Sequence, residues 1–458
     1  MSIYETLINR RISIYGTLVN KVNTMTLGEL QLPEEVWVQV FSFLSVQDKL
    51  SVRATCRYFR EILDKSCCLW KGFSVVLSKF SAYNRQFWSS LTQRNIGSVV
   101  VRNGRRKNLK QLGMWLPAVG SIALENWSEV SADELKLFSK LRRLAVRSSV
   151  SPLKVSGFLI PLSLQLTQLS VCNVRLACPA TDFINAVSNM TRLTSLLFHH
   201  DGSQRIPLRD FHALLSGLPN LQHLSWEMIT YKTLTHDFFN PTAACGRPAD
   251  LVLSSLELLN YDTVVSQEVL RPLSRLRSLS VYHLYSVPGP TCHLQTWLTG
   301  LQQLTCLSVH GGHPLGVYAD FLPASLRSLT LCVDLTAEDL QTVGTKLPDL
   351  QHLHLEPWGS AGLVGLVPHL FPRLRTLKMR HHNVPDSDFL RLQQLQHLET
   401  LEILDSYHRP DRDDPDRVTY RPGPHLLYLI AQLQSLTNHR VRVVTCRQHR
   451  DPFTCHCV

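Results

Sequence analysis

The sequence predicts an α/β protein in which a small N-terminal helical domain precedes a long, curved array of repeats. Two patterns support this. From Ile96 onward, the pattern LxxLxL recurs at intervals of 22 to 32 residues, and polar-apolar stretches suited to helices separate the copies. Residues 32–63 instead show a continuous apolar helical pattern. With 458 residues, 44% of them hydrophobic, the chain can fill both parts with a core.

The first 28 residues are expected to be a disordered leader. They contain a small duplication, SIYETLINRRI followed by SIYGTLVNKVN, ahead of a second methionine, Met25. An incorrect start site is the alternative explanation. No function is assigned to this segment.

The next stretch, LPEEVWVQVFSFL from Leu32, predicts an amphipathic helix with proline at its first turn. Two apolar stripes run along this helix: Val36, Val40 and Phe43 in one, and Trp37, Phe41 and Leu44 in the other. A domain this small can bury one stripe but not both. The remaining apolar surface therefore predicts a protein partner.

Residues 29–75 resemble an F-box. The motif elements occur in order: Leu32, Pro33 and Glu35, then Val40, Phe41 and Leu44, then Asp48 and Leu50, then Cys56 and Tyr58, and finally Leu69 and Trp70. Many F-boxes have tryptophan where this chain has Tyr58. The resemblance implies a helical domain that docks on the Skp adaptor. It places the adaptor contact at Leu32, Pro33, Val36, Val40, Phe41 and Leu44.

Residues 76–404 contain about 13 degenerate copies of the repeat, with the period of leucine-rich repeats. The fourth and sixth residues of each copy point to the same side of a short strand, so they can stack on the next copy. Helices are wider than strands, so the parallel sheet should be concave and the helices convex, as in a horseshoe. The asparagine or cysteine usual after the strand is mostly missing from its expected position.

Residues 405–458 are predicted to form a polar loop, a capping helix and strand, and a Cys/His tail. The tail has two possible roles besides disorder. Its Cys446, His449, Cys455 and Cys457 could bind zinc, although their spacing fits no common finger. Cys455, fourth from the end, could instead be lipidated, although His456 and Cys457 are not the aliphatic residues of a prenylation signal.

The third, fifth and seventh residues of each copy should face the concave side. Those that could bind a substrate are Arg102, Arg143, Arg147, His199, His223, Tyr282, His310, His352, His354, Lys378 and Arg380. Arginine can bind a carboxylate or phosphate through two parallel N–H donors, so an acidic or phosphorylated segment is the expected ligand. The alternative is that these residues are merely solvated. His352 and His354 lack a clear third metal ligand, so no metal is predicted.

The formal net charge of +11 is concentrated in one block. From Lys65 to Leu124 the sequence has ten Lys or Arg residues and no Asp or Glu. Nucleic-acid binding through residues 65–110 is therefore one hypothesis, and a solvated basic surface is the alternative.

No P-loop, GxGxxG, HExxH or GxSxG motif indicates catalysis, and no cofactor is expected. The sequence shows no signal peptide and no apolar run long enough to span a membrane. The scattered cysteines favour a reducing compartment, the cytoplasm or the nucleus.

An F-box followed by leucine-rich repeats is similar to the leucine-repeat class of F-box proteins. This resemblance implies a non-catalytic substrate receptor of a Skp–cullin–F-box ubiquitin ligase, with the repeats holding the protein to be ubiquitinated. The runner-up is a leucine-rich-repeat scaffold or inhibitor that acts without degradation. A nucleic-acid binder is the third hypothesis.

Overall fold

The computed structural model describes residues 32–44, 46–127, 132–148, 159–200, 206–231, 234–240, 251–262, 268–284, 292–356, 362–382, 384–404, 422–445 and 453. The predicted leader, Ser45, most of the polar loop and the Cys/His tail apart from Phe453 lie outside this range. The chain divides into two compact units. The helical unit comprises residues up to 75 together with 79–99, and the repeat unit comprises 76–78 and 100–458.

The helical unit is built around a cluster of aromatic rings. Its helices are α2 (Glu34–Ser42), α3 (Val46–Thr55), α4 (Arg57–Lys65) and α5 (Arg85–Gln93), with short 3-10 turns at Cys67–Trp70 and Phe80–Ala82. Trp37 and Phe41 of α2 lie one turn apart and stack with ring centroids 5.7 Å apart. Phe59 of α4 meets both rings edge-on, at 4.7 and 5.3 Å. These contacts fix α2 against α4.

A buried carboxylate links the helices of this unit. Asp64 accepts hydrogen bonds from Arg53 of α3 and from Arg94, which follows α5, at 2.8 and 2.7 Å. Arg94 also lies over the ring of Trp70, 4.5 Å from its centroid. Burial by itself would raise the pKa of Asp64, but the two guanidinium groups outweigh it and hold that pKa below its ordinary value.

The repeat unit contains a long parallel sheet. Among the described residues, fifteen strands follow one another in chain order without a crossover. They are β1 (Ser74–Leu77), β2 (Ser98–Arg102), β3 (Ser121–Glu125), β4 (Arg143–Arg147), β5 (Gln168–Val174), β6 (Ser195–His200), β7 (His223–Glu227), β8 (Ser255–Tyr261), β9 (Ser278–His283), β10 (Cys306–His310), β11 (Ser328–Cys332), β12 (His352–Leu355), β13 (Thr376–Met379), β14 (Thr400–Ile403) and β15 (Arg442–Val444). The first two strands contain the boundary between the units.

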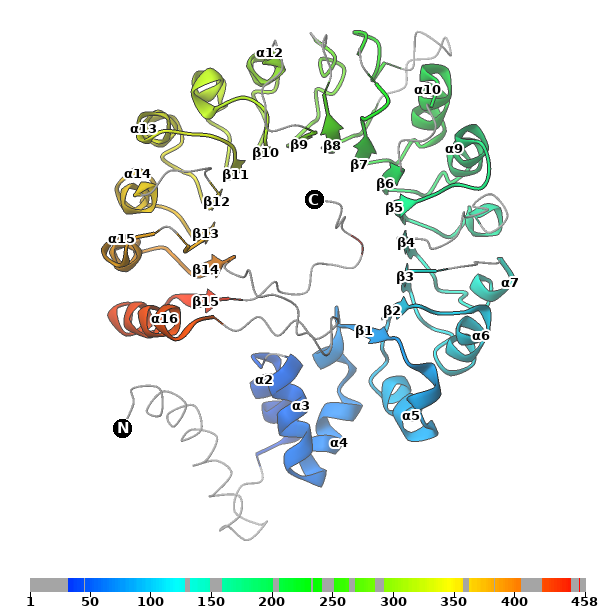
Figure 1. Cartoon of the computed structure of the whole chain (residues 1–458). Coiled ribbons are helices and arrows are strands. Elements are labelled where there is room, and N and C mark those ends of the chain that lie inside the picture. Colours follow the sequence, from blue (N-terminus) through cyan, green and yellow to red (C-terminus); the bar gives the residue numbers. More distant parts are fainter. Residues whose placement is uncertain are drawn as a thin grey trace. The chain divides into compact units, whose positions relative to one another are not determined.

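Helices and 3-10 turns cover the outer side of this curved sheet, so the fold is the predicted α/β horseshoe (Figure 1). The helices are α6 (Arg106–Trp115), α7 (Ala132–Leu135), α9 (Ala180–Ser188), α10 (Leu208–Gly217), α12 (His293–Gly300), α13 (Ala337–Lys346), α14 (Val367–Leu370), α15 (Asp386–Arg391) and α16 (Pro424–Leu436). The 3-10 turns of this unit are Ile160–Leu162, Leu315–Val317, Ala319–Phe321, Leu363–Leu366 and Leu392–Gln394. None of the helices in the described part of the chain has both the length and the hydropathy of a membrane span.

The register of the sheet explains the repeat pattern. Each fourth and sixth residue is paired with its equivalent in the next copy: Leu307 with Leu329, and Val309 with Leu331. These side chains are almost fully buried on the helical side of the sheet. The fifth residues form a second row on the other side, which for β9 to β12 runs through Ser280, Ser308, Thr330 and His354.

The missing asparagine of the repeat is displaced by one position. In five copies the eighth residue has a left-handed backbone, with φ near +50°: Asn103, Asn126, Ser148, Asn173 and Asn260. Asparagine tolerates this conformation better than most residues. The amide of Asn103 donates to the carbonyl of Glu125 at 3.0 Å, and that of Asn126 to Arg147 at 3.1 Å. The turn thus continues the hydrogen bonding between copies past the end of each strand.

Candidate functional site

One face of α2 is an exposed apolar surface, which we call the α2 stripe. It consists of Leu32, Pro33, Val36, Val40 and Phe43. Phe43 is 82% exposed, and Val40 is 43% exposed. Leu50 and Tyr58 are further exposed apolar side chains of the same unit. An apolar surface on a small helical unit of this kind is typical of a protein-binding site.

The structure places the predicted adaptor residues in three environments: exposed, half-buried and buried. Leu32, Pro33, Val36 and Val40 lie on the α2 stripe, and Leu44 is half-buried just after the helix. Phe41 is only 2% exposed and packs inside the unit. Phe41 is therefore not accessible for the direct adaptor contact that was predicted, because Trp37 and Phe59 already enclose its ring. It instead packs in the core of the helical unit. Phe43 takes its place on the surface.

The early concave residues are engaged by neighbours on adjacent strands. Arg102 pairs with Glu125 at 2.6 Å, and Arg147, which is buried, lies 4.0 Å from the same carboxylate. Arg143 donates to the side-chain oxygen of Gln168 on the next strand. The predicted basic end is thus partly neutralised by Glu125.

Two of the predicted histidines are bonded to serines on the following strands. His199 is fully buried, and its Nε2 lies 2.7 Å from the Ser225 hydroxyl. Nδ1 of His223 lies 2.8 Å from Ser255. Burial lowers the pKa of His223, which favours the neutral ring. Ser225 donates in turn to Glu257 at 2.6 Å, so this part of the face is a polar network.

Tyr282 and His310 form a stacked pair farther along the face. Their ring centroids are 4.1 Å apart and their planes differ by 16°. Burial, followed by the charge of His354, lowers the pKa of His310 to about 4. The ring is therefore neutral at physiological pH, and the pair offers a flat aromatic surface with no net charge.

Two of the late concave residues, His354 and Arg380, contact Glu356, which follows β12. Its carboxylate accepts from Nε2 of His354 at 2.7 Å and from Arg380 at 2.6 Å. Burial opposes ionisation, but these two partners lower the pKa of Glu356 to about 2. Lys378 lies 4.0 Å from Glu402 on β14, and His352 is exposed at the start of β12. His354 and Arg380 are thus tied to one carboxylate that the sequence pattern did not single out.

A possible metal-binding group lies at the same place. Cys332, His354 and Glu356 have ligand atoms within 4.8 Å of one another. Of the two histidines on β12, only His354 belongs to this group. Glu356 already bonds His354 and Arg380, and burial raises the pKa of the Cys332 thiol to about 12. In this structure Glu356 is therefore engaged by His354 and Arg380, and the thiol of Cys332 stays protonated.

Several residues of the basic block are ion-paired. Arg94 pairs with Asp64, Arg102 with Glu125, and Arg106 with the fully buried carboxylate of Glu134 at 3.1 Å. Lys110 lies 3.9 Å from the same Glu134. The acidic partners lie outside the block in the sequence, so the fold neutralises part of its charge.

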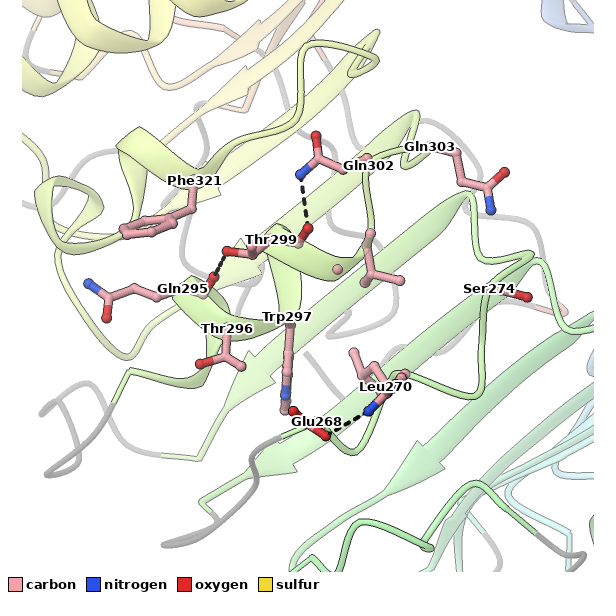
Figure 2. A pocket seen from close by; sticks show the side chains of 13 residues that line it. Glu268, Leu270, Ser274, Gln295, Thr296, Trp297, Thr299, Gln302, Gln303 and Phe321 are labelled. Atoms are coloured by element: carbon pink, nitrogen blue, oxygen red, sulfur yellow. Dashed lines mark hydrogen bonds and ion pairs between the residues drawn. The ribbon is translucent and has the colours of Figure 1, made fainter.

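An open pocket of ≈ 930 Å³ is lined by residues of α12 and its neighbours (Figure 2). Trp297, Gln295 and Phe321 are among the residues that line it. The described lining includes no histidine or cysteine, and its carboxylate, Glu268, is paired with Arg271 at 3.3 Å. The other polar groups of the lining include the hydroxyls of Ser274, Thr296 and Thr299.

Comparisons with known proteins match part of the helical unit to a family model. Residues 30–75 match the family model described as F-box-like. No curated protein matches the chain. Among solved structures, the chain is similar to TLR13 in the TLR13–ssRNA13 complex, at 17% identity and a TM-score of 0.38, covering 75% of this chain and 56% of that one. It is also similar to an internalin, InlF, from Listeria monocytogenes str. 4b F2365, at 14% identity and a TM-score of 0.35, covering 93% of this chain and 100% of that one. Both TM-scores are below 0.5, so the evidence for the repeat architecture is the strand register and not these similarities.

Proposed function

We propose that this chain, in which an F-box-like domain at residues 30–75 precedes leucine-rich repeats, is the substrate receptor of a Skp–cullin–F-box ubiquitin ligase. The α2 stripe binds the Skp adaptor, and the concave face of the repeats binds the protein to be ubiquitinated. The chain itself does no chemistry in this account. It works in the cytoplasm or the nucleus.

The observation that carries this proposal is the division of α2 into two faces. The face with Trp37 and Phe41 builds the domain, and the face with Val36, Val40 and Phe43 is left exposed beside it. A stripe of this kind fits an apolar groove on a partner, which would remove it from water on binding.

The proposed contribution to ubiquitin transfer is proximity. Holding a client and a ubiquitin-charged enzyme in one complex makes an encounter between two molecules effectively intramolecular. The repeat unit suits the client side, because its concave face is a continuous surface built from thirteen strands, β3 to β15, of the described sheet.

The client site that the contacts favour is not uniformly basic. Glu125, Glu356 and Glu402 lie next to the predicted cationic residues. The described face combines ion pairs at both ends with the Tyr282–His310 stack between them. A client segment with both charged and aromatic side chains fits this surface, and a phosphorylated segment would compete with these carboxylates for Arg102 and Arg380.

The test is copurification from cells that express the tagged full chain. The proposal expects the Skp adaptor and a cullin to copurify, and expects both to be lost on changing Leu32 and Pro33 to alanine. Client proteins should accumulate when the chain is depleted. Copurification of the adaptor without accumulation of any bound protein would favour the alternative, a scaffold or inhibitor that acts without degradation.

A further inference from the structure

Phe453, near the end of the chain, lies on the concave side of the first repeats. Its side chain forms a buried cluster with Val100, Ala123 and Ala145. The guanidinium carbon of Arg143 lies 4.1 Å from the centroid of its ring. Phe453 is 9% exposed, so the ring is enclosed although it comes from a segment more than 300 residues away in sequence.

The sequence of the early strands explains why a ring fits there. Val100, Ala123 and Ala145 are the fifth residues of three successive copies, so their side chains point away from the repeat core. Ala123 and Ala145 are direct partners in the sheet. Two methyl groups side by side leave space for a planar side chain, and the larger Val100 and Arg143 border that space.

The position of Arg143 completes the site. Its side chain donates to Gln168 and lies over the ring, an arrangement that combines a hydrogen bond with a cation–π contact. The ring therefore meets apolar groups and a cation together. Such a site discriminates in favour of aromatic side chains over aliphatic ones.

We propose that Val100, Ala123, Ala145 and Arg143 form a socket for an aromatic side chain, and that Phe453 fills this socket as an internal competitor of client binding. A client occupies the socket with its own aromatic residue and displaces Phe453. The inference rests on the proposed function for its client, because it assigns a ligand class and a regulation to the concave face. The socket itself can be tested without any client.

Tethering accounts for the regulation. When its linker can reach the socket, a tethered segment of the same chain has an effective concentration there of roughly millimolar order. A client residue of similar intrinsic affinity must overcome that concentration. Removal of the Phe453 ring should therefore open the socket to ligands added in solution.

The experiment uses full-length protein and a fluorescent peptide with the sequence of residues 446–458, CRQHRDPFTCHCV, under reducing conditions. Anisotropy measures its binding to the wild type and to the Phe453→Ala variant. The proposal expects the variant to bind the peptide on the order of tenfold more tightly than the wild type, because the tethered competitor is gone. A peptide with alanine in place of the phenylalanine should bind neither protein.

A matched pair of second substitutions locates the binding site. Ala145→Arg, added to Phe453→Ala, should abolish peptide binding because it fills the socket. Ser280→Arg is the control, because Ser280 occupies the same fifth position in a later strand, β9. It should leave peptide binding unchanged.

Adaptor binding, measured on the same preparations, separates the two proposals. It should be equal in all variants, since none of the changes touches the α2 stripe. Equal peptide binding by wild type and Phe453→Ala, no binding by either, or equal binding of the alanine peptide would overturn the socket. If the wild type does not bind the adaptor, the proposed function is contradicted. The proposal of the socket would be unaffected.

Discussion

Phe41 and Phe43 lie two residues apart at the end of α2, yet Phe41 is enclosed by Trp37 and Phe59 whereas Phe43 is almost fully exposed. Phe41 should therefore contribute to the stability of the helical unit, and Phe43 to the binding of a partner. Phe41→Ala should lower the free energy of unfolding of the helical unit by about 3–5 kcal/mol, because it leaves a cavity among aromatic rings. Chemical denaturation of the full chain, followed by tryptophan fluorescence, measures this change.

Phe43→Ser is the matched control for that measurement. It should change the free energy of unfolding by no more than about 0.5 kcal/mol, as expected for an exposed side chain. A large loss of stability in this variant would mean that Phe43 packs within the protein and is not available to a partner.

The Asp64 carboxylate should be required for the stability of the helical unit. Asp64→Asn leaves Arg53 and Arg94 without their anionic partner, and Arg94 is largely buried. We expect a loss of about 3–5 kcal/mol in the free energy of unfolding. Glu61→Gln, which removes the exposed pair with Arg57, should cost less than about 1 kcal/mol.

The contribution of Asp64 should also depend on pH. Its pKa is lower in the folded protein than in the unfolded chain, where it is about 3.9. The stabilisation is therefore fully present above about pH 4 and is lost as the pH falls through the folded pKa. The difference in stability between wild type and Asp64→Asn should shrink in that acidic range, and a constant difference would contradict the ion pairing.

His310 should resist protonation in the folded state. Its pKa of about 4 lies below the ordinary value of about 6.5, because burial and the charge of His354 oppose protonation. Its contribution to stability is fully present above about pH 6.5 and falls as the pH drops from there towards 4. His310→Gln should reduce the slope of stability against pH in this window by up to about 1.4 kcal/mol per pH unit.

NMR titration of the His310 ring provides the direct check. The account expects a midpoint near 4 in the folded protein. A midpoint near that of a free histidine would show that the ring is solvated, and the Tyr282–His310 stack would then not be the neutral surface described here.

The capping box of α13 should contribute to local stability. The hydroxyl of Thr336 accepts from the Asp339 amide at 3.2 Å, and the Thr336 amide donates to the Asp339 carboxylate at 2.8 Å. Thr336→Ala should cost about 1 kcal/mol. Thr345→Ala, at an exposed position of the same helix, should be nearly neutral, and equal losses in both variants would argue against the cap.

The sequence was sufficient for the periodic parts of the fold. The LxxLxL spacing predicted the strands, their parallel order and the burial of each fourth and sixth residue, because these follow from a strand period of two. The capping box of α13 has an equally local signal, because Thr336 is followed three residues later by Asp339. The two stripes of α2 were predicted, but the pattern alone could not tell which of them is buried.

The ion pairs and the other contacts of the candidate site could not be predicted in this way, because they join different copies, and the copies differ in length. Glu125 and Glu356 sit at the seventh position of their own copies, but their pairing with Arg102 and Arg380 needs the register between strands. The left-handed turn at Asn103 and Asn126 could have been found by looking one position earlier than the usual asparagine. The position of Phe453 has no local signal, because it rests on contacts with strands more than 300 residues away.

Calorimetric titration of the purified full chain with the Skp adaptor tests the central claim most directly. The account predicts a one-to-one complex for the wild type and for Leu436→Ser, a control at an exposed apolar residue of α16. Val40→Asp combined with Phe43→Asp should weaken adaptor binding by at least about 30-fold, because central apolar contacts are lost. The unfolding midpoint of the protein should not change. No complex with the wild type, or undiminished binding by the doubly substituted protein, would contradict the account.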